Sequence, residues 1–486
     1  MNQPLRGKHM RGLVLLVLVL QLFAHAPAAA HWQDTPLART IDRALADPAL
    51  AHGIQGVLVH SLNDGRVLYE KNKDLVFIPA SNFKLITSAS ALDVLGRDYK
   101  FQTSLYASGE QRPDGVLKGD VILVGRGDPV FKYEHLEAMA AGIKERGIKF
   151  VEGNVVGDDA WFDGVRLGWG WSWDDEPYYY SAQISALNLN KNVVDVWVRP
   201  GRKVGARALV RVTPPTSYMT VRNECATSAA GSKKSVFVDR IRGRNVIRVT
   251  GSVPLDYKSE GPEEAITMEE PTLFAAQTLA EILYRNGIEV KGRPVRGKKP
   301  EDAKLLAVHK SPAMSEILAL LNKPSDNLIA EVLLKTLGAE VKGKGSAAAG
   351  EEVELDLLKK VGLDMTAVNI TDGSGLSRHN YISPQNLVTL LEYMYRHKHS
   401  KVYLDSLPIA GVDGTLRRRM KETAAEGNAR AKTGYVSRVS TLSGFVTTKA
   451  GEPLVFSIMM NNHLCRNTEA KALQDKIVAA LANLGG

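Results

Sequence analysis

One short motif in this chain has the residue types and spacing needed for nucleophilic attack on a carbonyl group. The tetrapeptide S-N-F-K at 81–84 places a hydroxyl three positions before an amine, and positions i and i+3 share one face of a helix. A serine hydroxyl is a weak nucleophile until a base within hydrogen-bond reach removes its proton. Lysine can act as that base when its pKa is lowered. We therefore expect Ser81 to be the nucleophile and Lys84 its base.

Further along the chain stand the motifs S-D-N at 325–327 and K-T-G at 432–434. Lys432 is the expected second cation that, together with burial, lowers the pKa of Lys84. Each motif has a structural alternative: Ser81 as a helix N-cap, S-D-N as a capping turn and K-T-G as a turn before a strand. Their occurrence together favours one catalytic site that contains Ser325, Asn327 and Lys432.

Backbone amides near the nucleophile are expected to stabilise the negative charge that develops on the attacked carbonyl. Ser81 is predicted at the start of a helix, where unpaired amides and the helix dipole favour an anion. The amide of Tyr435 would supply the second donor of an oxyanion hole. We expect glycine at Gly434 because a side chain there would obstruct the approaching substrate.

Hydrophobic periodicity predicts the elements that position these motifs. Alternating apolar and polar residues around an N-D-G turn predict a hairpin over 54–78, and helical spacing predicts a helix from Ser81 to Leu95. Further helices are predicted over 272–285, 314–321, 327–337, 347–361 and 384–396, followed by a hairpin over 441–448 and 454–460 and a helix over 469–484 capped by Thr468.

Residues 99–255 have a different character, with short strands separated by glycine and proline. Examples are 121–124, 193–198, 209–212 and 246–250. Strands at both ends of the chain with helices between them predict one α/β domain assembled from the two termini. The β-rich block would then be inserted into that domain, and all three motifs would belong to the outer domain.

The N-terminus has the parts of a secretory signal peptide. Basic residues within 6–11 precede an apolar run over 13–23 and then small residues at 28–30. We expect cleavage after Ala30, with Ala26 as the alternative. The apolar run is shorter than the ~20 residues of a membrane-spanning helix, which argues against an uncleaved anchor. We therefore expect a periplasmic protein without a stable membrane anchor.

Composition and charge limit the classes of binding partner expected for the mature protein. With 44% hydrophobic and 24% charged residues, the chain is that of a soluble globular protein. The whole chain has a net charge of +9, and removal of residues 1–30 takes away three positive charges, which leaves about +6. An exported protein meets acidic envelope polymers rather than nucleic acid, and the densest basic patch is at 417–421. A solvated helix face is the alternative for that patch.

No cofactor is expected from the sequence. His397 and His399 are two positions apart and no H-E-x-x-H motif is present, so a metal site is not predicted. The chain has two cysteines, Cys225 and Cys465. Export makes a disulfide chemically possible, but the two positions fall in different predicted domains, and we expect two free thiols.

The order S-x-x-K, S-x-N, K-T-G resembles the active-site signature of penicillin-binding proteins and serine β-lactamases. The long separation of Ser81 from Ser325 is unlike the short connection in β-lactamases. Together with G-D at 119–120, G-D-P at 127–129 and D-G-S-G-L-S-R at 372–378, it resembles the class C low-molecular-mass penicillin-binding proteins. These are D-alanyl-D-alanine carboxypeptidase/endopeptidases.

The resemblance implies a fold and a set of domains. A transpeptidase-like α+β catalytic domain, of antiparallel sheet plus helices, would cover 31–96 and 269–486. An insert of two small β-rich subdomains would cover 97–268. The substrates would be peptidoglycan stem peptides, and penicillin would acylate the enzyme because its strained amide imitates D-Ala-D-Ala.

The resemblance also implies a role for each matching residue. Ser81 would be acylated, Ser325 would relay a proton to the leaving D-alanine amine, and Asn327 would hold the substrate amide and orient the lysine base. Lys432 and Thr433 would bind the terminal carboxylate of the substrate.

Recognition of the diaminopimelate side chain is a further implication. In the family it involves an Asp of the insert and an Arg near the active site, and the matching positions are Asp158 and Arg378. An exposed carboxylate at the end of a strand is the alternative for Asp158. Relatives can carry paired cysteines in the insert, whereas this insert contains Cys225 alone.

Two other functions compete with a peptidase. A β-lactamase is disfavoured because no E-x-x-L-N element lies between Ser325 and Lys432. A non-catalytic wall-binding protein would have no need to keep a nucleophile, a base and a carboxylate anchor together. The balance of carboxypeptidase and endopeptidase activity stays open, because both reactions break a bond after D-alanine, and so does the oligomeric state.

Overall fold

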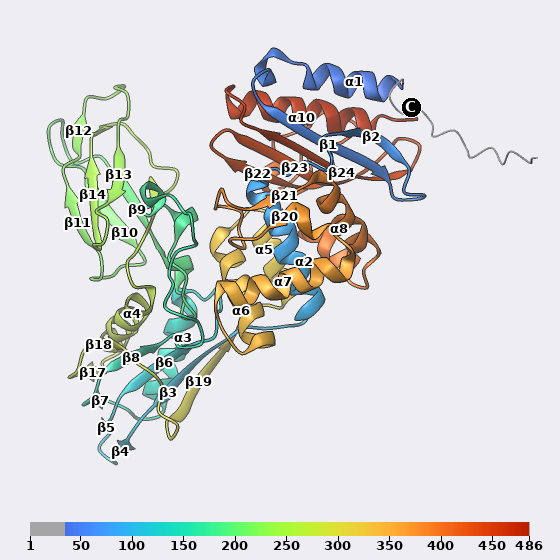
Figure 1. Cartoon of the computed structure of the whole chain (residues 1–486). Helices are drawn as coiled ribbons and strands as arrows, with labels where there is room; N and C mark the ends of the chain where they lie inside the picture. Colours follow the sequence, from blue (N-terminus) through green and yellow to red (C-terminus); the bar gives the residue numbers. More distant parts are fainter. Residues whose placement is uncertain (1–34, 486) are drawn as a thin grey trace, which may run out of the picture.

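The two ends of the chain form one antiparallel sheet. The computed structural model describes residues 35–485 and is drawn in Figure 1. In spatial order the strands are β2 (Val67–Lys71), β1 (Ile54–Ser61), β24 (Pro453–Asn461), β23 (Val439–Thr447) and β22 (Arg430–Val436). All neighbouring strands are antiparallel, which confirms the predicted hairpins. The K-T-G motif lies on β22, at an edge of this sheet.

Helices α1 (Pro36–Leu45) and α10 (Asn467–Ala482) lie together along one face of the sheet (Figure 1). The predicted cap of the last helix is wrong. The Arg466 amide, just before the helix, donates to the side chain of Glu469 at 2.8 Å. Glu469 therefore satisfies the first free amide, and Thr468 lies inside the first turn of α10.

A cluster of helices packs around a central helix, α2, and α8 of this cluster contacts β1 and β24. The helices are α2 (Lys84–Val94), α5 (Met314–Asn322), α6 (Asn327–Lys342), α7 (Ala347–Val361), α8 (Pro384–Arg396) and α9 (Ser400–Ser406). Nine of the eleven residues of α2 are buried. Many of them are alanine, serine or threonine, whose small side chains let neighbouring helices approach on every side. The helices predicted over 314–321, 327–337, 347–361 and 384–396 are confirmed, the helix predicted from Ser81 becomes α-helical at Lys84, and α9 was not predicted.

The chain between β2 and α5 contains a separate group of sheets with α3 (Tyr133–Glu145) and α4 (Pro271–Arg285) (Figure 1). One five-stranded sheet has the order β18-β8-β6-β3-β19, and a four-stranded sheet has the order β17-β7-β5-β4. Their strands are β3 (Gln102–Ala107), β4 (Glu110–Gln111), β5 (Val116–Lys118), β6 (Val121–Gly125), β7 (Phe150–Val151), β8 (Val155–Asp158), β17 (Glu289–Val290), β18 (Pro294–Arg296) and β19 (Lys304–Lys310).

A second group of small sheets lies at the far end of the insert (Figure 1). Its strands are β9 (Val193–Arg199), β10 (Leu209–Thr213), β11 (Thr220–Asn223), β12 (Ala226–Ser228), β13 (Phe237–Arg240), β14 (Val246–Thr250), β15 (Ser252–Pro254) and β16 (Glu264–Thr267). The strands predicted from sequence correspond to β6, β9, β10 and β14. One continuous hydrophobic core joins the two groups, from Leu105 and Val155 to Val194 and Ile247. A short pair, β20 (Val368–Asn369) and β21 (Tyr381–Ile382), lies near α2 and α8.

The strand pairings bear on where the insert ends. β18 pairs with β8, and β19 pairs with β3 along its whole length. α4 packs against β8 and β18. Since all these partners belong to the insert, we propose that it extends to Lys310 rather than to residue 268. The sequence pattern did not reveal this, because α4 has the same helical periodicity as the helices of the outer domain.

The structure shows the state of the two cysteines and allows a search for membrane-spanning helices. Cys225 is buried and Cys465 partly buried, and both are free thiols, as predicted. Within residues 35–485 we find no helix with the length and apolar character needed to cross a membrane. The predicted signal peptide lies outside the described residues.

Candidate active site

Ser81 lies in a 3₁₀ turn, Ala80–Phe83, that leads directly into α2. Lys84 is the first residue of α2, and its Nζ donates to Ser81 Oγ at 2.9 Å. Phe83 is the N-cap of α2, and within residues 35–485 Lys84 is the one hydrogen-bond partner of the Ser81 side chain. The nucleophile and its expected base are therefore in contact, and the hydroxyl is not occupied by a structural role at the helix start.

The backbone has positive φ angles at two residues near this contact. Ala80 has φ 47° and Ser325 has φ 66°, both in the left-handed region. This region costs an L-residue about 1 to 2 kcal/mol, and such residues occur often at active sites, where the surrounding packing holds them in place. The strained positions adjoin Ser81 and begin the S-D-N motif, so the loops that meet here are held in uncommon conformations.

Lys84 is completely buried and has a full set of acceptors. Besides Ser81, its Nζ donates to Asn327 Oδ1 at 2.6 Å and to the backbone oxygen of Ser374 at 2.6 Å. Burial lowers its pKa to about 8, although the carboxylates of Asp372 and Glu331 act in the opposite direction. A lysine with this pKa is neutral in part of the molecules near neutral pH, as a general base must be.

Lys432 is also completely buried and reaches the S-D-N motif. Its Nζ donates to Ser325 Oγ at 2.8 Å and to the backbone oxygen of Thr433 at 2.8 Å. Burial, followed by the positive charge of Lys84, holds the pKa of Lys432 well below its usual value. The sequence predicted that burial and Lys432 together lower the pKa of Lys84; burial is the cause of that shift, and the charge of Lys84 acts on the pKa of Lys432 instead.

Gly434 brings strand β22 against the turn that carries the nucleophile. A Cβ atom at this position would lie 2.5 Å from the backbone oxygen of Pro79 and would also collide with the side chain of Thr441. Glycine is therefore required for the close approach of two segments of the protein itself. This reason differs from the one expected from sequence, which was obstruction of the substrate.

A cleft of about 590 Å³ connects these groups. It is lined by Ser81, Asp175, Tyr179, Tyr180, Pro324, Ser325, Asn327, Gly375, Leu376, Thr415, Thr433, Gly434, Tyr435, Val436, Ser437 and Lys471. The insert contributes one wall of it and is tied to the catalytic helices, because Asn327 Nδ2 donates to the backbone oxygen of Tyr180 at 2.7 Å.

Of the two residues expected to bind diaminopimelate, Arg378 lies beside the cleft and Asp158 does not line it. Arg378 is exposed and its Nη1 donates to the backbone oxygen of Ser437 at 2.7 Å. Asp158 is buried at the end of β8, where its oxygens accept from the amides of Ala160 at 2.9 Å and Lys299 at 2.7 Å. Both oxygens of Asp158 thus serve the insert backbone.

Asp175 is the carboxylate that lines the cleft, and the sequence interpretation missed it. Its Oδ1 accepts from the hydroxyl of Tyr180 at 2.9 Å, and its other oxygen makes no hydrogen bond within residues 35–485. Asp175 follows a run rich in tryptophan and precedes a run of tyrosines, W-S-W-D-D-E-P-Y-Y-Y at 171–180. This dense group of aromatic and acidic residues in a loop was the available signal.

A buried carboxylate behind Lys84 was also missed. Glu331 accepts from the amides of Ser374 at 2.8 Å and Gly373 at 3.3 Å. It therefore holds the loop whose Ser374 oxygen receives Lys84. Burial, followed by the charge of Asp372, raises the pKa of Glu331 to about 8. Its position four residues after Asn327, on the same face of α6, was the only signal in the sequence.

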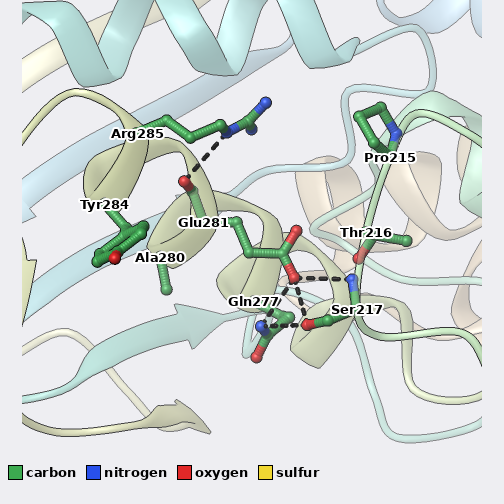
Figure 2. Close-up of a pocket in the computed structure, with 8 residues that line it drawn as sticks. All are labelled: Pro215, Thr216, Ser217, Gln277, Ala280, Glu281, Tyr284 and Arg285. Carbon is green, nitrogen blue, oxygen red and sulfur yellow. Dashed lines mark hydrogen bonds between the residues drawn. The ribbon is translucent and has the colours of Figure 1, made fainter.

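A second pocket, of about 490 Å³, lies in the insert between α4 and the segment Pro215–Ser217 (Figure 2). Glu281 is its central polar group and accepts from Ser217 and from Gln277 Nε2. None of the residues of the three sequence motifs lines it. The cleft beside Ser81 is therefore the candidate active site.

Known proteins resemble this chain over nearly its whole length. The family model described as the D-Ala-D-Ala carboxypeptidase 3 (S13) family matches residues 37–484. A D-alanyl-D-alanine carboxypeptidase of Actinomadura sp. (strain R39) is 40% identical over 97% of this chain and 89% of its own. The D-alanyl-D-alanine carboxypeptidase DacB of Haemophilus influenzae is 27% identical over 88% of this chain and 90% of its own.

Solved structures show the same fold. The crystal structure of penicillin binding protein 4 (dacB) from Haemophilus influenzae has a TM-score of 0.79 and 27% identity, and covers 91% of this chain and 98% of its own. A second crystal structure of that protein, complexed with a β-lactam, has a TM-score of 0.73 and 26% identity over 92% and 98% of the two chains. The predicted transpeptidase-like α+β fold and the predicted class of enzyme are confirmed, and this chain belongs to the D-Ala-D-Ala carboxypeptidase 3 (S13) family.

Proposed function

We propose that the protein is an exported serine-type D-Ala-D-Ala carboxypeptidase that acts on peptidoglycan stem peptides through an acyl-enzyme on Ser81. The observation that carries this proposal is the 2.9 Å contact between Ser81 Oγ and the buried amine of Lys84. A pKa of about 8 gives this lysine the capacity to accept the serine proton near neutral pH.

In the acylation step, Ser81 Oγ attacks the carbonyl carbon of the penultimate D-alanine and its proton passes to neutral Lys84. The amides of Ser81 and Tyr435 stabilise the oxyanion. The C–N bond then breaks, and the leaving D-alanine amine takes up a proton. Water later attacks the ester on Ser81, adds its OH to the acyl carbon and its other hydrogen to Ser81 Oγ, and releases the shortened peptide. Lys84 then gives the proton it took up to solvent and Lys432 regains one, so both lysines return to their starting states.

Ser325 and Lys432 form the path for the proton that the leaving amine needs. Their side chains are 2.8 Å apart, and Lys432 holds its proton weakly because its pKa is well below the usual value. Ser325 lines the cleft and Lys432 does not, so the serine hydroxyl is the group that touches the leaving amine. Thr433 lines the cleft and keeps its proposed contact with the terminal carboxylate.

Asn327 has two roles in this proposal. Its Oδ1 accepts from Lys84 and so orients the base toward Ser81. Its Nδ2 donates to the backbone oxygen of Tyr180 in the insert. A shift of the insert wall would therefore move Asn327 and, with it, Lys84. Asn327 also lines the cleft, where it can hold the substrate amide.

For the diaminopimelate side chain we assign Arg378 and Asp175. Such a side chain ends in an ammonium and a carboxylate, which call for one anionic and one cationic partner. Arg378 lies beside Ser437 at one end of the cleft, and Asp175 belongs to the insert wall. Asp158 is excluded because the backbone occupies both of its oxygens.

Inhibition by penicillin and export complete the proposal. The relative from Haemophilus influenzae was crystallised with a β-lactam, which supports binding of such compounds here. Residues 1–30 have the composition of a cleaved signal peptide, and the periplasm contains the proposed substrate. Endopeptidase action on crosslinked peptides uses the same acyl-enzyme and differs only in the leaving amine.

Release of D-alanine from a stem pentapeptide tests the function. We expect stoichiometric release by the wild-type protein and none by the variant Ser81→Ala. Ser232→Ala, an exchange at an exposed serine of the insert, serves as the matched control and should match wild type. Release of D-alanine by Ser81→Ala at the wild-type rate would remove Ser81 from the reaction.

A further inference from the structure

Lys471 lines the cleft although it belongs to none of the sequence motifs. It lies in the second turn of α10, which packs against β23, next to the edge strand β22. Among the residues that line this cleft, Lys471 is the one cation and Asp175 the one carboxylate. Water solvates a partly exposed amine, but an anion from the protein or from the substrate would stabilise it further.

The protein does not supply that partner within residues 35–485. No ion pair and no hydrogen bond joins the Nζ of Lys471 to any described side chain. Asp475, one turn further along α10, is held by Arg419 Nε at 2.9 Å. The amine lies over the ring of Tyr435, whose centroid is 5.8 Å from Nζ. This aromatic contact is weak compared with an ion pair.

The surroundings of Lys471 favour an incoming anion. The side chain is half-buried, and burial followed by the charge of Arg419 lowers its pKa. A bound carboxylate would reverse both effects, because it would compensate the lost hydration and the neighbouring charge. Lys432 is less suited to this task, since its amine is fully buried and already donates to Ser325 and Thr433.

The contact with Tyr435 places Lys471 on the face of β22 opposite the side of Gly434. Successive side chains of a strand point to opposite faces. Gly434 abuts the turn of Ser81, so Thr433 and Tyr435 belong to the other face. There Thr433 Oγ1 donates to Thr415 Oγ1 at 2.8 Å, and Tyr435 lies beside Lys471. Hydroxyl donors and a cation therefore gather along one side of the cleft.

We propose that Lys471 binds the carboxylate of the substrate's leaving group, together with the hydroxyls of Thr433 and Thr415. This assignment rests on the proposed function, because it takes the leaving group to be a D-amino acid with a free carboxylate. Lys471 is a binding residue and takes no part in proton transfer. It gives the enzyme its preference for a leaving group that carries a negative charge.

Two thioesters of the same N-acyl-D-alanine test the proposal. In one the leaving thiol is mercaptoacetate, which carries a carboxylate, and in the other it is mercaptoacetamide, which is neutral. Lys471→Met should lower kcat/KM on the mercaptoacetate ester about tenfold, mainly through KM, as expected for loss of one charged contact in a half-exposed site. On the mercaptoacetamide ester it should stay within about twofold of wild type.

Three further variants complete the comparison. Lys471→Arg keeps the charge and should retain most of the preference for mercaptoacetate. Lys471→Gln should repeat the loss with a polar side chain. Lys476→Met removes an exposed lysine of the same helix and should behave as wild type. Thermal melting and the final extent of penicillin labelling report whether each variant is folded.

The outcomes separate this inference from the proposed function. Equal losses on both esters, or no loss on either, would overturn the role of Lys471 while the enzyme remained a serine peptidase. If the wild-type protein hydrolysed neither ester and formed no adduct on Ser81, the proposed function would fail and the assignment of Lys471 with it.

Discussion

One wall of the cleft is built by α2, the turn before it and the edge strand β22, with Ser81 at its surface and Lys84 and Lys432 buried behind it. The opposite wall, with Asp175 and Tyr179, comes from the insert. In the first wall both lysines are 0% exposed and have hydrogen-bond acceptors for their amines. In the second, Tyr179 is 59% exposed, and Asp175 keeps one oxygen without a described partner. In the first wall each lysine is already hydrogen-bonded to a serine before substrate arrives. The second wall presents side chains with hydrogen-bonding capacity and exposed surface that a substrate can use.

This difference predicts that changes in the first wall abolish the reaction, whereas changes in the second alter which peptides react. The contact between Asn327 and Tyr180 links the two walls in the site, and Lys191 of the insert pairs with Asp326 beside it.

Lys84→Arg should lower the rate of acylation by penicillin by roughly 10²- to 10⁴-fold, the usual contribution of a general base. Arginine keeps the positive charge but cannot give up its proton at any working pH. Stopped-flow measurement of labelling with a fluorescent penicillin gives the rate. Lys335→Arg is the matched control, because Lys335 is also buried but pairs with Asp163 outside the cleft. Equal losses in both variants would mean that strain, and not the lost base, explains the effect.

Arg378→Ala should lower kcat/KM roughly ten- to a hundredfold on peptides with a free diaminopimelate terminus. Acylation by penicillin, which lacks that side chain, should hardly change, and Asp175→Asn should behave in the same way. Arg438→Ala is the matched control, since Arg438 is equally exposed and also donates to a backbone oxygen, that of Leu464. A uniform loss on all substrates would show that Arg378 is structural.

The rate of acylation should rise with pH and level off above about 8, the pKa to which burial lowers Lys84. The sign follows from the role of the base: below its pKa the neutral fraction of Lys84 falls about tenfold for each pH unit. Rates of penicillin labelling between pH 6 and pH 10 measure this rise. A rise that levels off only near the ordinary pKa of lysine, or a rate that does not depend on pH, would contradict the assignment of Lys84.

Asp158→Asn should leave substrate preference unchanged and destabilise the insert by about 1 to 3 kcal/mol. An asparagine oxygen can accept from one of the two amides that Asp158 now serves, but its NH₂ group faces the other. Thermal unfolding of the variant measures the loss, and kinetics on diaminopimelate peptides measure the preference. A selective loss on those peptides would restore the sequence-based assignment.

The sequence was a good guide to the first wall because its parts are local. A helical turn brings Ser81 and Lys84 together at three positions' separation, whereas no strand was predicted over K-T-G, which lies on β22. The long-range meeting of Lys432 with Ser325 followed from the resemblance of the motifs. Burial was expected to lower the pKa of Lys84, but the effect of Lys84 on the pKa of Lys432 was not foreseen.

The second wall was harder to predict because loops carry it. Asp158 and Asp175 are both insert carboxylates, and the chain alone does not indicate which of them the backbone occupies. Lys471 looked like one more lysine of the last helix, and only the packing of α10 beside β22 brings it to the cleft. The proposed end of the insert at Lys310 also depends on long-range pairing, because strand β19 pairs with β3 at the other end of the insert sequence.

Mass spectrometry of the protein after exposure to penicillin shows directly whether Ser81 is acylated. We predict one adduct with the full mass of the antibiotic, mapped by peptide digestion to Ser81, stable enough to isolate and absent from Ser81→Ala. An adduct on another residue, or an undiminished adduct in Ser81→Ala, would contradict the account. Rapid loss of the adduct with turnover of penicillin would indicate a β-lactamase instead.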